Sequence, residues 1–481
     1  MATLIAIILV FIAIWLIALM LFQGLSGRAE FLSVRNFFLL GFIVFQLVSG
    51  ALAIVGPRTR DFGLVGMPTT AMIYLFMVTV FLGIFLVAYQ RGWLVHRLAN
   101  YIPVGTAEPA AASMLTLAFV FLGVGVFFRV VLIQIPVVAP AFFMMGSALL
   151  AVAAGMSAWV WAGRMFNPVL AVAMVVITGI ALAGVLHTDF GRRAILGVVG
   201  CVGWGAYHGS WKHLGPRRVV VLLGGAGLGA LVLVAAFTAA RDSSNRDRSL
   251  GQAVTAVRGA NVKEGVRLLL TGQDAGRNSM WLLENYPERY PYDTLHTARY
   301  FLTLGIPREF YENKPEALGR TAVAQANADR KRASNYSIGP GLIGHMATDN
   351  PFLALPIYAL FGALFMSLLD RLIAIHPTNP FVILPIGTTL GQFVGLARGE
   401  TGLFLFQAFM GITAAWVLMF MCAKVLGMIG WQMQTTDDTD DQWYDEAPDD
   451  EWDPDGDEHD RWDSPWSDEQ YDESSYEAST Y

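Results

Sequence analysis

The sequence predicts an all-α, polytopic membrane protein with about eleven membrane-spanning helices. Of its 481 residues, 55% are hydrophobic and only 15% are charged, and the mean hydropathy is +0.50. Soluble domains are usually about a quarter charged. Apolar runs of about 20 residues, the length that crosses the hydrocarbon of a bilayer, recur along most of the chain. The composition therefore excludes an ordinary soluble fold.

These apolar runs locate the expected spans. The first run lacks a basic flank and a small-residue cleavage site, so we expect a retained helix rather than a signal peptide. The seventh run is amphipathic, because it contains Trp204, Tyr207 and His208. A short turn at Ile135 and Pro136 joins the fourth and fifth runs. The expected spans are residues 3–23, 35–55, 70–90, 112–135, 139–163, 167–187, 193–210, 218–240, 350–370, 380–397 and 402–427.

The distribution of basic residues orients these spans. Lys and Arg in short loops favour the cytoplasmic side. With the N-terminus outside, ten basic residues of the short segments lie inside and five lie outside. This topology predicts four parts of the chain, with the second part outside and the fourth part in the cytoplasm. They are an N-terminal bundle of about eight helices (1–240), a large loop (241–349), about three further spans (350–430) and a tail (431–481).

The large loop holds 15 basic and 12 acidic residues. Apolar residues recur at near-helical spacing in Gln252–Leu270 and in Tyr292–Leu304. We therefore expect amphipathic helices packed on the outer membrane face, with Trp281 near the headgroups. A glycine-rich stretch, Ser337–Gly344, leads into the next span. It either forms a turn or lets the backbone approach a ligand closely.

The tail has a composition typical of disorder. From Asp437 onward it contains 20 acidic residues and one basic residue, so the preceding residues carry a net charge of +13. Such a segment buries too little apolar surface to offset its chain entropy. Its interspersed Trp and Tyr residues fit either a partner-binding segment or a merely solvating tail. A basic membrane body suits an anionic substrate or anionic lipids.

Several cations are expected near the outer surface or within the bilayer. Arg129 lies inside the fourth span, where a charge is costly and is a functional candidate, although a snorkelling arginine is an equal alternative. Arginine presents a planar donor fork that suits phosphate. A lipid-embedded cavity lined by arginines would match a polyprenyl diphosphate. The candidate cations are Arg129, Arg192, Arg193, Arg299, Arg308, Lys314 and Arg398.

Candidate general bases lie in the same outer segments. His345, His296, Glu400 and Asp293 are the residues that could deprotonate an acceptor hydroxyl. For each histidine, a structural role is the alternative. Cys201 and Cys422 both lie in apolar runs and predict neither a disulfide nor a zinc site. No metal-ligand spacing, phosphate-binding loop, nucleophile elbow or dinucleotide fingerprint is present in a supporting context.

One part of the chain resembles a known family. Gly305–Pro315 reads GIPREFYENKP and resembles the Pro-Arg and Lys-Pro element of Wzy-type oligosaccharide repeat unit polymerases, also called O-antigen polymerases. In that family a small-residue stretch and a helix follow, which Ser337–Gly344 and the span from Pro351 match. The turn 396–400 is similar to the family's Arg-Gly pair followed by an acidic residue. The resemblance covers mainly residues 290–402.

The resemblance implies a metal-independent glycosyltransferase with a GT-C-like helical fold and no cofactor. Such an enzyme moves a growing glycan from undecaprenyl diphosphate onto the next lipid-linked repeat unit, at the outer face of the bacterial cytoplasmic membrane. The product is an O-antigen, a capsule or an exopolysaccharide. Arg308, Lys314 and Arg398 carry over as diphosphate or sugar contacts. Expected partners are the lipid-linked oligosaccharide, membrane lipids and chain-length regulators or other assembly proteins, but no nucleic acid.

Three other functions remain open. An O-antigen ligase would share the helices, loop and arginines but would use another acceptor. A flippase or transporter of lipid-linked sugars predicts internal repeats and paired broken helices near mid-membrane. A non-catalytic assembly protein would recruit partners through the acidic tail.

Overall fold

The computed structural model describes most of the chain before the acidic tail. These residues belong to one compact unit, Met1–Thr436. The tail, the turn at Pro136 and residues 241–254 lie outside the described residues, so the expectations about them stay predictions. The described residues are 1–56, 62–102, 109–135, 139–186, 192–240, 255, 257–271, 274–327 and 337–428.

Within these residues the fold is all-helical, as expected, and it contains no strand. In the part of the chain that the structure describes, nine helices are long and apolar enough to cross a membrane, which gives the architecture of a multi-pass membrane protein. They are α1 (Ala2–Leu25), α2 to α3 (Val34–Val55), α4 (Met67–Gln90), α6 with η2 (Ala111–Gln134), α7 (Ala139–Gly163), α8 (Pro168–Leu186), α10 (Pro216–Ala240), α17 (Pro351–Ile375) and α20 (Thr401–Met428).

Two of the eleven expected spans do not form such a helix, so that count is not confirmed. The seventh is α9 (Arg192–Gly209), a helix whose polar face leaves it less apolar than the nine. The tenth is broken into α18 (Pro380–Gly387) and α19 (Leu390–Leu396). At the break, the Thr388 and Thr389 hydroxyls donate to backbone carbonyls of the preceding turn, each at 2.7 Å. Such bonds, together with a proline inside α18, weaken the helical ladder.

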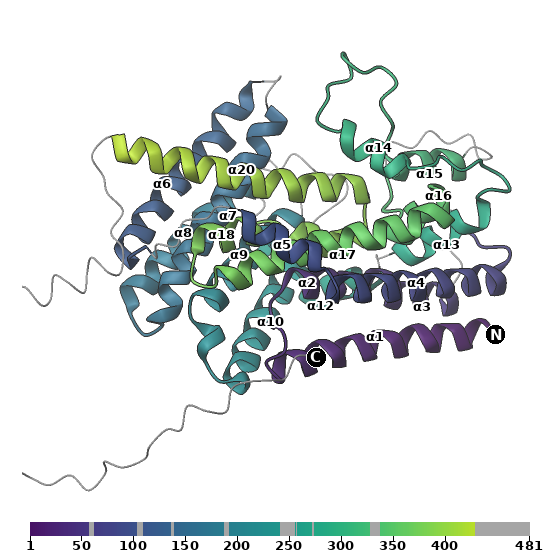
Figure 1. The fold of residues 1–481 in the computed structure, drawn as a ribbon, viewed down its shortest axis with the longest axis horizontal. Coiled ribbons are helices and arrows are strands. Elements are labelled where there is room, and N and C mark those ends of the chain that lie inside the picture. The colour runs from purple at the N-terminus through teal and green to yellow at the C-terminus, as the bar shows by residue number, and fades with distance from the viewer. Residues whose placement is uncertain are drawn as a thin grey trace, which may run out of the picture. The chain divides into compact units, whose positions relative to one another are not determined.

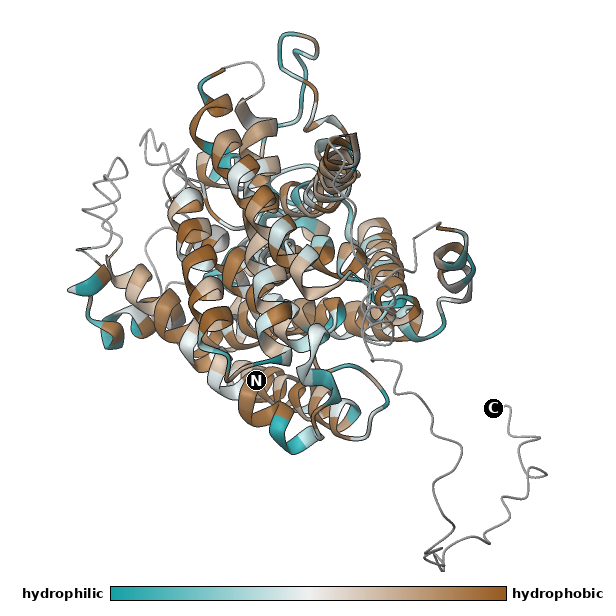
Figure 2. Cartoon of the chain, turned by 90° about the vertical axis from the view of Figure 1, so that its left-hand side faces the viewer, coloured by the Kyte–Doolittle hydropathy of each residue, from teal (hydrophilic) through white to brown (hydrophobic). Residues whose placement is uncertain are grey.

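The outward faces of the spans are strongly apolar. Val172 on α8 and Val221 on α10 are 62% and 73% exposed. Figure 2 shows that hydrophobic residues predominate along the helices of the bundle. A water-facing surface rarely carries apolar patches of this extent, whereas hydrocarbon accepts them. The exposed faces therefore fit a lipid environment.

Two interrupted helices pack against each other inside the bundle. The second span consists of α2 (Val34–Phe42), a π-helical segment η1 (Ile43–Val48) and α3 (Ser49–Val55). A side chain at Gly41 of α2 would collide with the Val394 carbonyl of α19, so glycine permits their close contact. Gln46 of η1 donates a hydrogen bond to the Ala397 carbonyl just after α19. The turn that follows α19 is thereby fixed to the second span.

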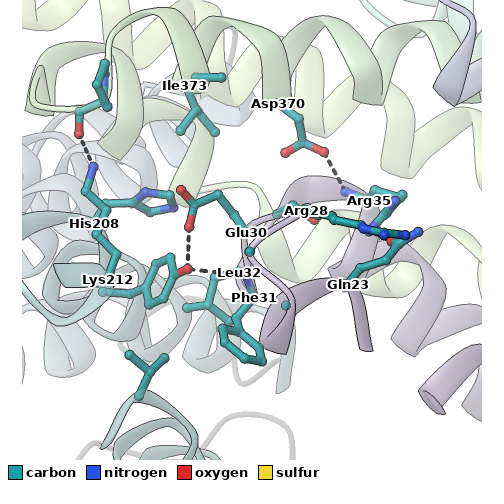
Figure 3. Close-up of a pocket in the computed structure, with 18 of the residues that line it drawn as sticks. Gln23, Arg28, Glu30, Phe31, Leu32, Arg35, His208, Lys212, Asp370 and Ile373 are labelled. Atoms are coloured by element: carbon teal, nitrogen blue, oxygen red, sulfur yellow. Dashed lines mark hydrogen bonds between the residues drawn. The ribbon is translucent and has the colours of Figure 1, made fainter. Parts of the chain in front are cut away.

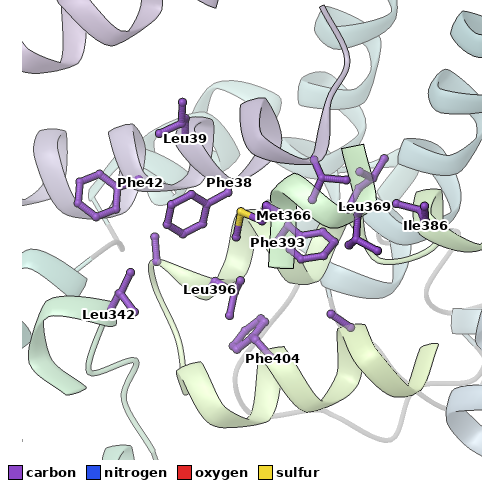
Figure 4. Close-up of a cluster of buried hydrophobic side chains, with 14 of the residues drawn as sticks. Phe38, Leu39, Phe42, Leu342, Met366, Leu369, Ile386, Phe393, Leu396 and Phe404 are labelled. Carbon is purple, nitrogen blue, oxygen red and sulfur yellow. The ribbon is translucent and has the colours of Figure 1, made fainter. Parts of the chain in front are cut away.

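The core is built where these helices meet α17 and α20. Figure 4 shows Phe38 and Phe42 of α2, Met366 of α17, and Phe393 and Phe404 around one apolar centre. The Phe404 ring lies so close to Gly395 and Gly399 that a Cβ at either position would overlap it. Glycine 399 of the 396–400 turn is therefore required by packing.

Apart from α12, which packs against α10, the short helices of the large loop lie at the end of the bundle where Met1 lies (Figure 1). The helical patterns expected in Gln252–Leu270 and Tyr292–Leu304 appear as α12 and α14, within the part of the loop that the structure describes. Elsewhere in the bundle are α5 (Trp93–Tyr101) and η3 (Trp211–His213). The loop helices are α12 (Val262–Thr271), α13 (Ala275–Asn285), α14 (His296–Thr303), α15 (Leu318–Asn327) and α16 (Leu342–Thr348).

Helix α13 packs against other elements of the protein. Trp281 is buried and makes an edge-on contact with the Phe62 ring at 5.4 Å, so its ring is covered by protein, and its expected depth near the headgroups stays a prediction. The Glu284 carboxylate accepts the backbone N–H of Val65 at 2.9 Å, just before α4 begins. The N–H groups at the start of a helix need acceptors, and Glu284 of α13 supplies one at the start of α4. This contact attaches the loop to the spans.

Candidate functional site

His345 lies at the centre of a buried network in α16. This helix starts after Gly341, whose φ of +77° favours glycine. The His345 side chain is fully buried. Its Nδ1 is 2.8 Å from the Thr297 hydroxyl, and its Nε2 accepts the backbone N–H of Thr401 at 3.2 Å. A neutral imidazole protonated at Nδ1 satisfies both contacts, so neither ring nitrogen is free for a substrate hydroxyl.

Asp349 holds the start of α14, a role that the sequence did not reveal. Its carboxylate is fully buried and accepts the backbone N–H of Thr297 at 2.8 Å and the hydroxyl of Tyr358. Leu295 precedes the helix in a left-handed conformation with φ of 57°. In sequence, Asp349 stands directly before α17 and would be read as part of that helix's cap. Only the fold brings it to α14.

Glu400 performs the same task for α15. Its two carboxylate oxygens accept the backbone N–H groups of Leu318 and Gly319 at 2.9 and 3.0 Å. One of these oxygens also lies 3.5 Å from Nε2 of His345. The acidic residue of the 396–400 turn thus anchors a loop helix that begins about 80 residues earlier. It is placed beside His345, as the sequence grouping implied, but it is engaged with the backbone.

The buried environment shifts both groups toward their neutral forms. Burial lowers the pKa of His345 to about 4, and the negative charge of Asp349 only partly opposes this shift. Burial also raises the pKa of Glu400, whereas the N–H groups of Gly319 and Leu318 lower it. At neutral pH the His345 imidazole is therefore uncharged and serves as a hydrogen-bonding spacer between α14 and α20.

His296 and Arg299 share the carboxylate of Asp293 on the outer face of α14. Nδ1 of His296 is 2.7 Å from one Asp293 oxygen, and Arg299 donates to the other. Nε2 of His296 lies 2.9 Å from the backbone carbonyl of Glu316. Both histidine nitrogens therefore have partners here too. The side chains of Asp293 and Arg299 are each 53% exposed, so this pair faces solvent.

The two halves of the Pro-Arg and Lys-Pro element behave differently. Lys314 donates to the backbone carbonyls of Leu304 and Ile306 at 2.9 and 2.8 Å, and so closes the turn after α14. Partial burial lowers the pKa of Lys314, and the nearby Arg308 charge adds to this effect. Arg308 is exposed, and its guanidinium is 4.0 Å from the Glu316 carboxylate. Arg308 is thus open to a ligand while Lys314 is occupied.

Arg320 joins this surface, and sequence reasoning missed it. It lies in the first turn of α15, outside the family-like motif, and is exposed. The pKa of Tyr300 is raised to about 12, chiefly by burial and also by the Glu400 charge, and the charges of Arg320 and Arg308 oppose this rise. Both arginines therefore act on one tyrosine of α14. Only the capping of α15 by Glu400 brings Arg320 to this place.

Arg129 and Arg398 do not join this surface. Arg129 is fully buried between α6, α7 and α8, where its guanidinium donates to Ser147 and the carbonyls of Gly184 and Val185. It also lies 4.0 Å above the Phe143 ring. It cross-links helices and does not snorkel to the surface. Arg398 is half-buried, 5.8 Å from the Phe45 ring. The side chains of Arg192 and Arg193 lie outside the described residues.

An apolar groove of about 270 Å³ begins beside the buried network and runs between α17 and α20. Its polar end consists of the hydroxyl-bearing residues Thr297, Tyr358 and Thr401. The first two contact His345 or Asp349, and the third donates its N–H to His345. The apolar lining comes from seven helices and includes Phe38, Phe81, Ala298, Phe301, Leu302, Leu342, Ile357, Phe361, Phe365, Met366, Leu396 and Leu405.

The Ser337–Gly344 stretch serves packing between protein elements. Its carbonyls at Gly339 and Pro340 accept hydrogen bonds from Asn278 and Ser279 of α13, each at 2.9 Å. A Cβ at Gly339 would crowd the Arg398 carbonyl. In the part of the stretch that the structure describes, the close backbone approach is therefore to α13 and the 396–400 turn. This favours the turn interpretation over the ligand-binding one.

These features define a helical multi-pass membrane protein with a polar site at one end and an adjoining apolar groove. Among the described residues, no three His, Cys, Asp or Glu side chains gather in a way that would hold a metal ion. No family model matches the chain, and neither a curated protein nor a solved structure is significantly similar to it.

Proposed function

We propose that the chain is a membrane glycosyltransferase that polymerises oligosaccharide repeat units carried on undecaprenyl diphosphate, at the outer face of a bacterial cytoplasmic membrane. One observation carries this proposal. Helix α14 is shared by an apolar groove and a cationic surface: Thr297, Ala298 and Phe301 line the groove, whereas His296 and Arg299 belong to the ion-paired cluster. A lipid-linked sugar combines these two chemistries in one molecule.

The groove suits the polyprenyl chain. It lies among membrane-spanning helices, and its lining is apolar and rich in aromatic rings. Ligand pockets with apolar walls and a few polar groups at one end fix the orientation of an amphipathic molecule. A chain that enters between α17 and α20 would leave its diphosphate beside Thr297 and Tyr358, at the loop end of the bundle.

Three arginines suit the diphosphate. Arg299, Arg308 and Arg320 are exposed around α14 and the start of α15. Guanidinium groups bind phosphate oxygens through paired donors. When the bond between the sugar and the diphosphate breaks, negative charge grows on the departing diphosphate, and fixed cations stabilise it. The arginines then lower the barrier without a change in their own position.

The acceptor hydroxyl needs a base that reaches substrate. Among the candidate bases, the Asp293 carboxylate is half-exposed, whereas His345 and Glu400 are buried and occupied. In the proposed step, Asp293 takes the hydroxyl proton, the acceptor oxygen bonds to the anomeric carbon, and the diphosphate leaves as the anion. His296 orients Asp293 through its 2.7 Å contact. His345 and Glu400 are then positioning residues for α14 and α15.

Filling the groove tests the lipid-binding part of the proposal. Gly362 of α17 lines the groove, and the nearest atom to an added Cβ is 4.0 Å away, so Gly362→Leu would occupy the groove without backbone strain. We expect chain growth from purified lipid-linked repeat units, without added nucleotide sugar or metal, to fall at least tenfold. Gly179→Leu on α8 is the matched control, because nothing lies within 4 Å of its Cβ. Equal activity of both variants would contradict the proposal.

Removing the cations tests the chemical part. The double variant Arg308→Ala, Arg320→Ala should lose chain growth at least a hundredfold, since each charge-assisted contact with phosphate contributes about 1.5–3 kcal/mol. Arg267→Ala on α12 removes an equally exposed arginine that pairs with Glu264 away from α14. This control should retain wild-type chain growth. Wild-type polymer lengths from the double variant would remove the site assignment.

One observation favours a second candidate, a flippase for the same lipid-linked sugars. Transporters often place substrate sites at paired interrupted helices. Here the π-helical segment of the second span packs against the broken pair α18 and α19 through Gly41 and Gln46. In proteoliposomes, movement of the labelled substrate across the bilayer without new glycosidic bonds would favour this function. Chain growth without such movement would favour the polymerase.

A further inference from the structure

A second polar cavity lies at the other end of the bundle from α14. Its volume is about 950 Å³, and it is enclosed by the connection between α1 and α2 and by the ends of α4, α9 and α17 (Figure 3). Helix α17 contains 25 residues, so about 37 Å separates its start near Asp349 from its end near this cavity. The cavity is therefore about one membrane thickness away from the candidate site at the loop.

The cavity is lined by more cations than anions. Arg28, Arg35, Lys212 and Arg371 line it, against two carboxylates. Both carboxylates are engaged. Asp370 accepts the N–H groups of Val34 and Arg35 at 2.7 and 3.1 Å and the Tyr89 hydroxyl at 2.8 Å. Glu30 accepts the Tyr207 hydroxyl. The acidic groups therefore serve the fold, and a net positive charge faces the cavity.

The four cations fall into two pairs. Arg35 donates to Gln23 at 2.8 Å, and Lys212 donates to the Pro377 carbonyl at 2.7 Å, so both are tied to the protein. In contrast, the side chains of Arg28 and Arg371 have no hydrogen-bond or ion-pair partner among the described residues. Arg28 only lies 5.6 Å above the Phe22 ring. The Nε atom of Arg371 is buried without a partner.

His208 adds an unsatisfied group to the same cavity. Its side chain is 2% exposed, and its Nε2 has no hydrogen-bond partner in the described part of the chain. The ring is fixed against Trp204 at 4.4 Å and Tyr207 at 4.9 Å. Buried polar atoms are nearly always paired, so an unpaired nitrogen at a cavity wall is a donor or acceptor that a molecule in the cavity can satisfy.

Two ordinary explanations account for only part of this arrangement. Cations near helix C-termini bind the last carbonyls, and Lys212 does so at Pro377. Basic residues also gather near the cytoplasmic ends of spans, where they remain in water. Neither explanation accounts for a guanidinium nitrogen and an imidazole nitrogen that are both buried and unpaired at one cavity.

We propose that this cavity binds a phosphate-bearing polar molecule, with Arg28 and Arg371 on the phosphate oxygens and His208 on a further polar group. Guanidinium donors match phosphate in geometry and charge. The volume exceeds that of a phosphate ion alone, so the phosphate belongs to a larger headgroup or metabolite. Both a phospholipid headgroup and a soluble phosphorylated compound provide this chemistry.

The test measures binding to the full-length protein in detergent and in nanodiscs. In the first arm, inorganic pyrophosphate is titrated by calorimetry into delipidated protein. In the second arm, native mass spectrometry counts phosphatidylglycerol retained from nanodiscs that also contain phosphatidylcholine. The variant Arg28→Gln, Arg371→Gln should weaken binding at least tenfold in one arm or both. The responding arm identifies the source of the phosphate.

A matched control excludes general loss of positive charge. Arg91→Gln, Arg164→Gln removes two exposed arginines that do not line the cavity. This control should bind as the wild type does, with an unchanged melting temperature. Absence of binding in both arms, or equal binding by the two double variants, would overturn the proposal. Because neither arm measures chain growth, failure here is distinguishable from failure of the proposed polymerase.

Discussion

The two polar ends of the bundle use similar residues for different purposes. At the loop end, the carboxylates of Asp349, Glu400 and Glu284 all accept backbone N–H groups at helix starts. At the other end Asp370 does the same for α2. The cations differ more. At the loop end, Lys314 and Arg299 are bound to carbonyls or a carboxylate, whereas Arg28 and Arg371 at the other end have no such partner in the described structure.

This difference teaches that a charge near a membrane surface has no single interpretation. A buried carboxylate at a helix start stabilises the fold, because the first turn of a helix leaves N–H groups without acceptors. A carboxylate in a half-exposed position, such as Asp293, instead pairs with the side chains of His296 and Arg299 and faces solvent. Conversely, an unpaired guanidinium at a cavity indicates a ligand. The following predictions rank how strongly each group supports the fold.

The largest expected effects come from the two capping aspartates, the buried Asp349 and the part-buried Asp370. Asp349→Ala leaves the Thr297 N–H and the Tyr358 hydroxyl without an acceptor, and Asp370→Ala does the same at α2. Each unpaired buried group costs about 1–3 kcal/mol, so either variant should lose roughly 3–5 kcal/mol of stability. Denaturant unfolding in micelles measures this. Asp349→Asn keeps an acceptor oxygen and should lose less than half as much; equal loss would argue against capping.

The next effect is a pH dependence that depends on His345. Because its pKa is about 4 in the folded protein and 6.5 in an exposed histidine, the unfolded state takes up the proton first on acidification. The stability that His345 contributes is complete above pH 6.5 and falls by roughly 3 kcal/mol as the pH decreases to 4. His345→Gln should remove most of this decrease. If the free energies of unfolding of the wild type and of His345→Gln change equally between pH 4 and 7, His345 is not the source of this pH dependence.

Glu400 should give a smaller effect of opposite sign. Because burial raises the pKa of Glu400 in the folded protein, its contribution to stability is greatest below the ordinary value of 4.5 and decreases as the pH rises through the raised value. Glu400→Gln removes this dependence and leaves one of the two α15 N–H groups poorly paired. We expect a loss of about 1–2 kcal/mol at neutral pH. Amide exchange at Leu318 and Gly319 should accelerate; unchanged exchange would contradict the cap.

The smallest effect is expected at the opposite end. Arg28→Gln and Arg371→Gln remove guanidinium groups that have no partner in the described structure, so each should change stability by less than about 0.5 kcal/mol. Thermal unfolding of delipidated protein is the appropriate measurement. A loss comparable to that of Asp370→Ala would mean that these arginines support the fold, and the contrast between the two ends would disappear.

Much of the fold follows from the sequence because hydrocarbon imposes a simple rule. A span needs about 20 apolar residues with every backbone group bonded within the helix. Nine of the eleven expected spans follow that rule, including those of α8 and α10. In the other two spans, polar side chains or a proline interrupt the apolar, fully bonded helix. Trp204, Tyr207 and His208 make α9 polar, and Pro385, Thr388 and Thr389 interrupt the tenth span.

The site was predictable only in outline. The sequence grouped His345 with Glu400, and these two residues do lie 3.5 Å apart. It did not indicate Asp349, Arg320 or Tyr358, because their partners are distant in the chain. It also grouped Arg129 with the outer cations, whereas this residue cross-links α6, α7 and α8. Which side chain meets which helix start depends on packing between segments up to 336 residues apart.

The sequence by itself determined that the chain is helical, that it is built for a bilayer, and that one polar loop interrupts its spans, because these properties depend on local composition and periodicity. The tertiary structure decided which charges are free. A carboxylate or guanidinium is identical in sequence whether it caps a helix or faces a cavity. Whether such a group has a partner depends on the packing between elements. At the loop end, α13 to α16 pack onto the spans, and at the other end the α1–α2 connection packs onto α9 and α17.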